Sequence, residues 1–178
     1  YPGSAWGFPA YAQLESGAVL MAGGIAAAGA TYAARAEAHL WTQSGGYVRV
    51  ADMPAPKYNF HAITLTDGQV LVAGGETQYG ASGSGHNATY HPTSNTWTVR
   101  SPLPGTPFAL AALPSGSALA MVQYPGQTYL FEPGTGTWKV SAPNPGYVAV
   151  VTLSDGRVLA QGGEGSSSTG RRSYVFAP

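Results

Sequence analysis

The sequence contains no cysteine, and this absence excludes several chemistries at once. Without a thiol the chain can form no disulfide, cannot use a cysteine nucleophile and offers no thiolate ligand to a metal. Charged residues make up only 9% of the chain, and 8 basic side chains balance 8 acidic ones. A sequence of this kind carries no electrostatic footprint for nucleic acid or for an anionic membrane surface. No apolar run reaches the roughly 18 residues that a membrane-spanning helix requires.

What the chain has instead is glycine and proline placed among apolar runs. It contains 25 glycines and 14 prolines in 178 residues, of which 44% are hydrophobic. Glycine and proline at this level indicate disorder only when the apolar content is low, so here they are interpreted as turns between strands. The length suits one domain. Because the sequence begins with Tyr1, we expect a processed product or a fragment of a longer chain.

The chain is organised around copies of one short stretch. It reads LTDGQVLVAGG at 65–75, with close copies LESGAVLMAGG at 14–24 and LSDGRVLAQGG at 153–163, and a weaker copy LPSGSALAMVQ at 113–123. Each copy passes from an apolar run through a polar pair and a glycine into a second apolar run, which predicts two short strands joined by a tight turn. A period of 40 to 51 residues between the turn glycines is typical of propellers and solenoids. These glycines are Gly17, Gly68, Gly116 and Gly156.

Two further features recur in phase with the copies. The stretch YHPTSNTW at 90–97 matches FEPGTGTW at 131–138, and Trp41 follows the first strand pair. A proline-bearing turn then precedes each next copy. Together with the glycine pairs, this order of segments resembles the kelch repeat over nearly the whole chain. The residues that carry the resemblance, and for which we expect structural roles, are Gly23, Gly24, Gly74, Gly75, Gly162, Gly163, Trp41, Trp97 and Trp138.

Kelch repeats form the blades of β-propellers, and each blade is a four-stranded antiparallel sheet. The resemblance therefore implies a single all-β domain with four blades, over residues 7–52, 57–100, 106–141 and 146–178. The fourth repeat stops at Pro178, before the outer strand that the other three contain, so we expect an incomplete last blade. Trp6 is too close to Leu14 for the head of the chain to supply that strand as well. Because sheet edges are normally covered, self-association or a larger parent chain is expected to complete the propeller.

Loops on one face of the propeller contain the candidate binding residues. The Ala- and Gly-rich segment 25–35 lacks a helix cap and is predicted to be a loop, while 76–87 is a long glycine-rich loop of the kind that often binds partners. Tyr and Arg are common at interaction hot spots, and exposed Tyr with Asn could equally stack on and bond a sugar. Ordinary solvated loop residues are the competing interpretation. The candidates are Lys57, Tyr58, Asn59, Glu76, Tyr79, His86, Glu164, Arg171 and Arg172.

The residues favour no catalytic or metal site. Copper enzymes of the galactose-oxidase type use kelch-like propellers, but that family needs a cysteine crosslinked to a redox tyrosine, and this chain has none. His39 and His91 are predicted on third strands far from the propeller axis, whereas His61 begins an inner strand. Glu76 and Glu164 are predicted two blades apart, too distant for the carboxylate pair of a glycosidase. We therefore expect no catalytic residue, no metal and no cofactor.

The leading functional hypothesis is a non-catalytic recognition or scaffold module that binds a protein or a glycan through the loops of one face. One alternative is the propeller portion of a galactose-oxidase-like or other kelch-propeller enzyme. Another is a lectin-like, carbohydrate-binding propeller. Few lysines among many Ser, Thr, Gly, Asn and Gln residues favour an exported or cell-surface bacterial protein.

Overall fold

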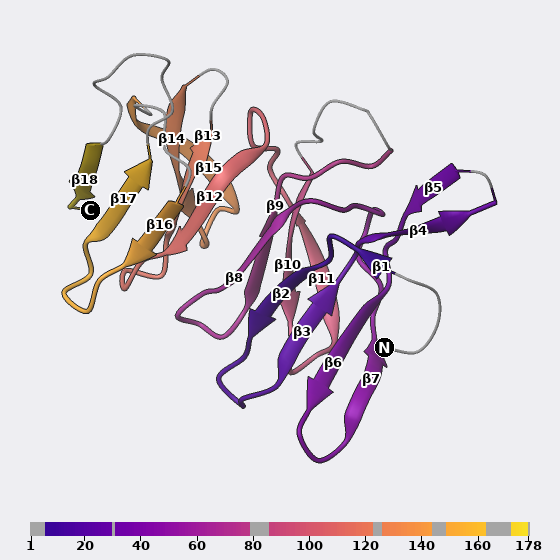
Figure 1. Ribbon diagram of the computed structural model, residues 1–178. Coiled ribbons are helices and arrows are strands. Elements are labelled where there is room, and N and C mark those ends of the chain that lie inside the picture. Colours follow the sequence, from indigo (N-terminus) through magenta and orange to yellow (C-terminus); the bar gives the residue numbers. More distant parts are fainter. Residues whose placement is uncertain are drawn as a thin grey trace.

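The chain folds into four antiparallel sheets arranged as the blades of a β-propeller (Figure 1). The computed structural model describes residues 6–29, 31–78, 86–122, 126–143, 149–162 and 172–177. Within these ranges the chain is all-β and contains no helix, so no described helix could cross a membrane. The predicted fold class is confirmed.

Each blade is built from strands that pair in an order set by the repeat. Blade 1 consists of β2 (Ala10–Gln13), β3 (Val19–Ala22), β6 (Ala38–Thr42) and β7 (Gly46–Val50). Blade 2 consists of β8 (His61–Thr64), β9 (Val70–Ala73), β10 (Asn87–His91) and β11 (Thr96–Arg100). Blade 3 consists of β12 (Pro107–Ala112), β13 (Ala118–Val122), β14 (Gln127–Glu132) and β15 (Thr137–Pro143). Blade 4 consists, in the described part of the chain, of β16 (Ala149–Thr152), β17 (Val158–Gly162) and β18 (Arg172–Phe176).

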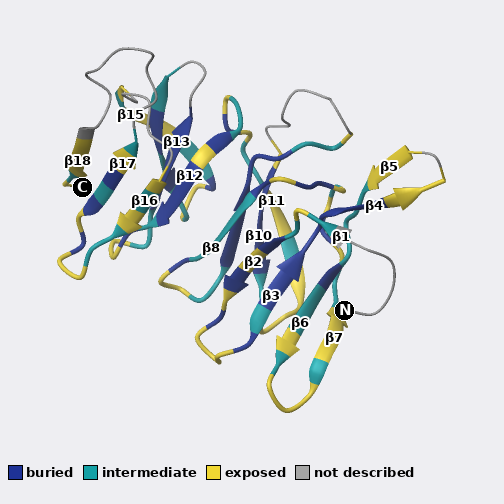
Figure 2. Ribbon diagram, viewed as in Figure 1, coloured by how far each residue is buried: buried dark blue, intermediate teal, exposed yellow. Residues whose placement is uncertain are grey.

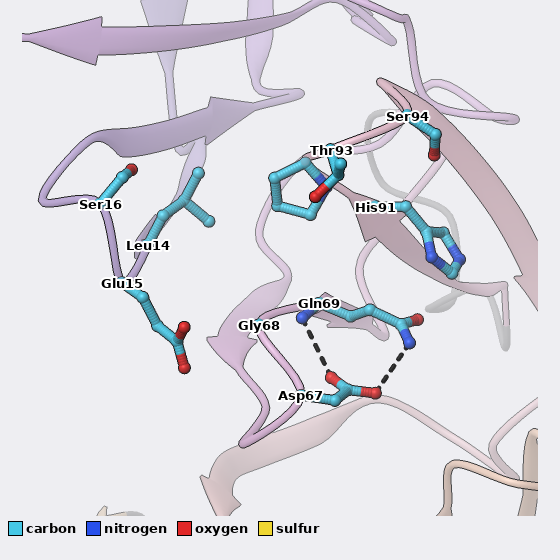
Figure 3. A pocket seen from close by; sticks show the side chains of 10 residues that line it. Leu14, Glu15, Ser16, Asp67, Gly68, Gln69, His91, Thr93 and Ser94 are labelled. Carbon is cyan, nitrogen blue, oxygen red and sulfur yellow. Dashed lines mark hydrogen bonds between the residues drawn. The ribbon is translucent and has the colours of Figure 1, made fainter.

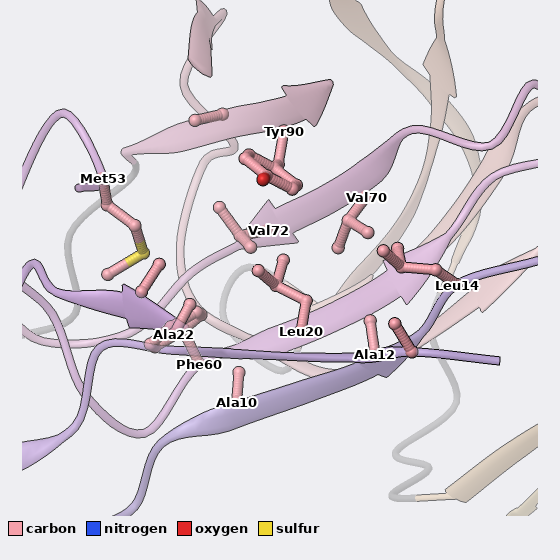
Figure 4. Close-up of a cluster of buried hydrophobic side chains, with 13 residues drawn as sticks. Ala10, Ala12, Leu14, Leu20, Ala22, Met53, Phe60, Val70, Val72 and Tyr90 are labelled. Atoms are coloured by element: carbon pink, nitrogen blue, oxygen red, sulfur yellow. The ribbon is translucent and has the colours of Figure 1, made fainter. Parts of the chain in front are cut away.

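The blades stack face to face through apolar side chains. In blade 1 the alternation of β2 turns Ala10 and Ala12 toward blade 2, where they meet Val70, Val72 and Tyr90 (Figure 4). Two similar clusters join blade 2 to blade 3 and blade 3 to blade 4. The second strands β9 and β13 are therefore buried on both faces, whereas β2 of blade 1 and β17 of blade 4 alternate between buried and more exposed residues (Figure 2).

The glycine pairs allow the segment that enters each blade to approach the end of the second strand. In blades 1 and 2 both residues of the pair have positive φ, which glycine adopts without the steric cost of a Cβ, whereas Gly162 of blade 4 lies within β17. A Cβ on Gly23 would lie 2.4 Å from the carbonyl oxygen of Lys57, in the segment that leads into blade 2. A Cβ on Gly75 would lie 2.8 Å from the carbonyl oxygen of Tyr58, in the same segment. The linking segment is thus held between the glycine pairs of two successive blades.

Blade 3 shows what happens without the pair. Val122 stands where the repeat places the first glycine, and β13 continues through this residue, pairing with Pro107 and Gln127. The chain therefore has longer strands in blade 3 at the point where blades 1 and 2 turn away.

The prediction of a loop at 25–35 is wrong. β4 (Ile25–Ala28) and β5 (Thr31–Ala34) pair as a hairpin, and β1 (Trp6–Gly7) adds to the other edge of β4. This small sheet projects beside blade 1 (Figure 1). Alanine has little intrinsic preference for strands, so pairing with the head of the chain decides the structure here.

Trp41 lies on a different strand of its blade from the corresponding tryptophans of blades 2 and 3. Trp97 and Trp138 are on the outer strands β11 and β15, whereas Trp41 is on the third strand β6 and pairs with Tyr47 of the outer strand. The equivalent pairs are Tyr90 with Trp97 and Phe131 with Trp138. Blades 1 to 3 thus each keep two aromatics opposite one another, but in blade 1 their order is reversed.

Candidate functional site

The candidate site lies on the segment that links blade 1 to blade 2. The backbone of Lys57 fixes this segment to blade 1: its N–H donates to the carbonyl of Arg35 over 3.0 Å, and its carbonyl accepts from Gly24 over 2.8 Å. Two residues further on, the N–H of Asn59 donates to the carbonyl of Phe8 over 3.1 Å. The segment is therefore anchored on blade 1 before it enters β8.

Tyr58 and Glu76 join the linking segment to the exit of the second strand of blade 2. Their backbones exchange two hydrogen bonds, of 3.1 Å from the Tyr58 N–H and 3.0 Å from the Glu76 N–H. Their side chains also meet, because the Tyr58 hydroxyl donates to Oε2 of Glu76 over 2.5 Å. The Asn59 amide reaches the other carboxylate oxygen over 3.5 Å. These contacts orient the carboxylate from two sides and leave lone pairs on both oxygens for a further donor.

Lys57 has an internal role. Its side chain is only 3% exposed, and its Nζ donates to the carbonyl of Gly74 over 3.1 Å and to the carbonyl of His86. The ammonium also lies 5.4 Å from the centre of the Phe60 ring. Burial lowers the pKa of Lys57 to about 8. The lysine therefore ties together Gly74 and His86, which flank the long connection between β9 and β10.

A small pocket of about 140 Å³ adjoins Lys57. Its walls are largely apolar and come from the link and from the middle of blade 2; they include Met53, Pro54, Val72, His86 and Val99. Such a pocket could take a small apolar group beside the exposed imidazole of His86.

The candidate binding residues, which were expected together on the loops at one face of the propeller (the rim), differ in how far they are exposed. Asn59 and His86 are exposed, and Glu76 is half-buried. Lys57 and Tyr58, which were expected on the exposed rim, are instead buried at 3% and 5% exposure. The cause is the close packing of the linking segment on the glycine pairs, which turns these two side chains inward. Arg172 is the first residue of β18, while Tyr79, Glu164 and Arg171 lie outside the described residues.

Sequence reasoning missed a larger cleft at the opposite ends of the strands. Turns of blades 1 and 2 converge there around about 370 Å³ (Figure 3). Asp67 accepts from the Gln69 backbone over 3.0 Å and from its side-chain amide over 2.7 Å, which is the turn chemistry that its sequence predicts. The sequence could not reveal this cleft, because three turns that are far apart in the chain come together to form it. The polar residues of the lining are Glu15, Ser16, Asp67, Gln69, His91, Thr93 and Ser94.

The histidines stay apart. His39 is on the third strand β6, His91 ends β10 and contacts the Thr98 hydroxyl over 3.1 Å, and His61 begins the inner strand β8. Burial lowers the pKa of His61, so its imidazole is neutral at pH 7. In the described part of the chain, no three His, Asp or Glu side chains are grouped so that they could hold a metal ion.

Comparison with known proteins shows similarity of fold alone. No protein-family profile matches the chain, and no curated protein matches its sequence. Among solved structures, a fungal alcohol oxidase of the AA5 family, in complex with copper, aligns with a TM-score of 0.63 and 17% identity over 95% of this chain. A structure of YjhT aligns with a TM-score of 0.69 and 13% identity over 98% of this chain. The chain spans 41% of the length of the oxidase and 68% of the length of YjhT.

Proposed function

We propose that this chain is a non-catalytic recognition module that binds a protein or a glycan through the rim at Asn59, Glu76 and His86. The observation that carries the proposal is the fixed carboxylate of Glu76, held between the Tyr58 hydroxyl and the Asn59 amide at a solvent-exposed edge. A carboxylate beside an amide can accept from sugar hydroxyls or peptide N–H groups and donate back to them. Because the chain already orients these groups, little ordering entropy opposes binding.

We also infer that the repeats are of the kelch type. The support is the shared geometry of the glycine pairs in blades 1 and 2 and the aromatic pairs in blades 1 to 3. The kelch type matters for function because it places the long connections between second and third strands on one rim, where Glu76 and His86 lie.

Two alternatives have unequal support. A lectin-like function would use the same rim, and it would be the correct assignment if the ligand proved to be a glycan. A copper oxidase function would need ligands and a redox centre that the described residues do not group together, and the chain contains no cysteine to modify a tyrosine. The residues present do not fit that centre.

The proposal can be tested with two defined probe sets, an array of purified oligosaccharides and a library of displayed random peptides. We expect the full chain to retain a restricted set of one kind and His86→Ala to weaken that binding. Glu15→Gln, at the opposite ends of the strands, is the control and should bind normally. Failure to retain any probe from either set would contradict the recognition role, and normal binding by His86→Ala together with Glu76→Gln would contradict the rim.

A further inference from the structure

The two end blades expose faces that the repeat normally covers. We define the leading face of a blade as the one that packs against the preceding blade, and the trailing face as the one that packs against the next. In blade 2 the leading face carries Val70, Val72 and Tyr90, and it covers the trailing face of blade 1 at Ala10 and Ala12. Residues that pair across neighbouring strands lie on the same face of a sheet, so the strand register shows which residues of different blades occupy matching positions.

The leading face has a characteristic aromatic pair. In blade 2 the rings of Tyr90 and Trp97 lie 5.0 Å apart, and in blade 3 those of Phe131 and Trp138 lie 5.1 Å apart. Tyr90 and Phe131 are fully buried. The Trp97 indole also donates to the carbonyl of Ala51, at the end of blade 1, over 2.7 Å. The pair is therefore part of the contact with the preceding blade.

Blade 1 has the same kind of leading face without a described blade in front of it. Trp41 and Tyr47 occupy opposite positions on β6 and β7, as the aromatic pairs of blades 2 and 3 do. Tyr11 lies on the same face of the inner strand, in register with Met21 and His39. Tyr11 is 56% exposed and Trp41 is 38% exposed. The residues that correspond to Trp41 in the next two blades, Tyr90 and Phe131, are fully buried, and on the blade 1 face Met21 is buried at 5% exposure.

Blade 4 has the complementary trailing face. Val151, Leu159 and Val175 stand in register across its three described strands, with Ala149 beside them. The corresponding inner-strand residues of blade 3, Ala109 and Ala111, are buried against blade 4. In blade 4 itself, Val151 is 54% exposed and Val175 is 50% exposed. The described part of this face combines the aliphatic row with a second row of Ala149, Gln161 and Ser173, and it contains no charged side chain.

The two faces do not meet within one chain. Each inner strand lies beside the next, β2 beside β8, β8 beside β12 and β12 beside β16, but no comparable contact of described residues joins β16 to β2. Blades 1 and 4 lie at opposite ends of the row of blades (Figure 1). At the inner-strand positions where blade 1 covers blade 2 with Ala10 and Ala12, the trailing face of blade 4 presents Ala149 and Val151.

We propose that the trailing face of blade 4 in one copy of this chain packs on the leading face of blade 1 in a second copy, head to tail. The contact repeats the chemistry of the interface between blades 1 and 2, in which the small inner-strand residues Ala10 and Ala12 belong to one cluster with Tyr90 and Trp97. Charge does not oppose it, because Arg49 at the edge of the blade 1 face is paired with Asp52 over 2.8 Å. A contact between two different faces is heterologous, so further copies can add in the same direction.

Sedimentation velocity of the full chain over a wide concentration range tests the proposal. We expect mass to increase with concentration for the unaltered chain. Tyr11→Lys and Val151→Lys each place a charge in one face at an exposed position, and each should weaken self-association at least about tenfold. Thermal unfolding close to that of the unaltered chain would show that both variants fold.

The decisive arm mixes the two variants. Tyr11→Lys keeps a normal blade 4 face, and Val151→Lys keeps a normal blade 1 face. At concentrations where neither variant associates alone, their mixture should therefore form a one-to-one dimer. A mixture that stays monomeric while the unaltered chain associates would overturn the head-to-tail arrangement. An unaltered chain that stays monomeric at all concentrations would overturn the proposal, and it is the result expected if further blades of a longer polypeptide cover these faces instead.

Discussion

Replacement of Lys57 by methionine tests the interior of the candidate site. Methionine has a similar length and no charge, so it keeps much of the packing but leaves the carbonyls of Gly74 and His86 without the ammonium donor. Hydrogen bonds to charged groups contribute roughly 1.5–3 kcal/mol each, and removal of the buried charge returns part of that. We expect Lys57→Met to lower the free energy of unfolding at pH 7 by about 1–3 kcal/mol.

The pH dependence of this difference is the sharper test. Burial lowers the pKa of Lys57 from 10.5 to about 8, so between these values the unfolded chain binds more protons than the folded one. The free energy of unfolding of the unaltered chain, minus that of Lys57→Met, should therefore rise with pH between about 8 and 10.5. A shift of this size corresponds to about 3 kcal/mol. The carbonyls and the Phe60 ring favour the charged form and make this an upper bound.

The assay is urea unfolding of both proteins at several pH values from 7 to 11. All ionisable groups other than Lys57 are common to both chains, so their contributions cancel in the difference. A difference that stays constant or falls from pH 8 to 10.5 would refute the reasoning, because it would mean that the carbonyls hold the pKa of the lysine at or above its ordinary value.

Three other predictions follow from the packing and composition. In urea unfolding, Gly75→Ala should lower the free energy of unfolding by about 2–4 kcal/mol and Gly17→Ala by only about 1–2 kcal/mol. Both glycines have positive φ, but only at Gly75 would the added Cβ collide with neighbouring atoms. Equal losses would contradict this explanation. Trp97→Phe should cost about 1 kcal/mol more than Trp138→Phe, since the first indole donates to Ala51 and the second has no acceptor; the reverse order would contradict it. Elemental analysis of the purified chain should find no stoichiometric copper, and one tightly held copper per chain would contradict the non-catalytic proposal.

The regular part of the fold could be predicted because the repeat is carried by local chemistry. A turn glycine between two apolar runs specifies a strand pair, and four copies of it predict four blades. Structural roles were expected for the glycine pairs, and Gly23 and Gly75 do lie so close to the linking segment that a Cβ would collide with its backbone.

The rest depended on contacts between segments far apart in sequence. The hairpin of β4 and β5 could not be predicted from an alanine-rich stretch, because its pairing with β1 is a tertiary contact. Lys57 was predicted to be exposed, as lysines usually are, and only the three-dimensional structure reveals the carbonyls that its ammonium meets inside. The cleft at Glu15 and Asp67 has the same origin, since turns of different blades form it.

The rim is tested most directly by isothermal titration calorimetry with the tightest oligosaccharide or peptide retained in the screens. Glu76→Gln keeps the size of the side chain but removes its charge, and we expect it to raise the dissociation constant at least about tenfold. Glu15→Gln makes the same chemical change at the opposite ends of the strands and should leave the constant within about twofold. A constant unchanged in Glu76→Gln, or raised equally by both substitutions, would contradict the account.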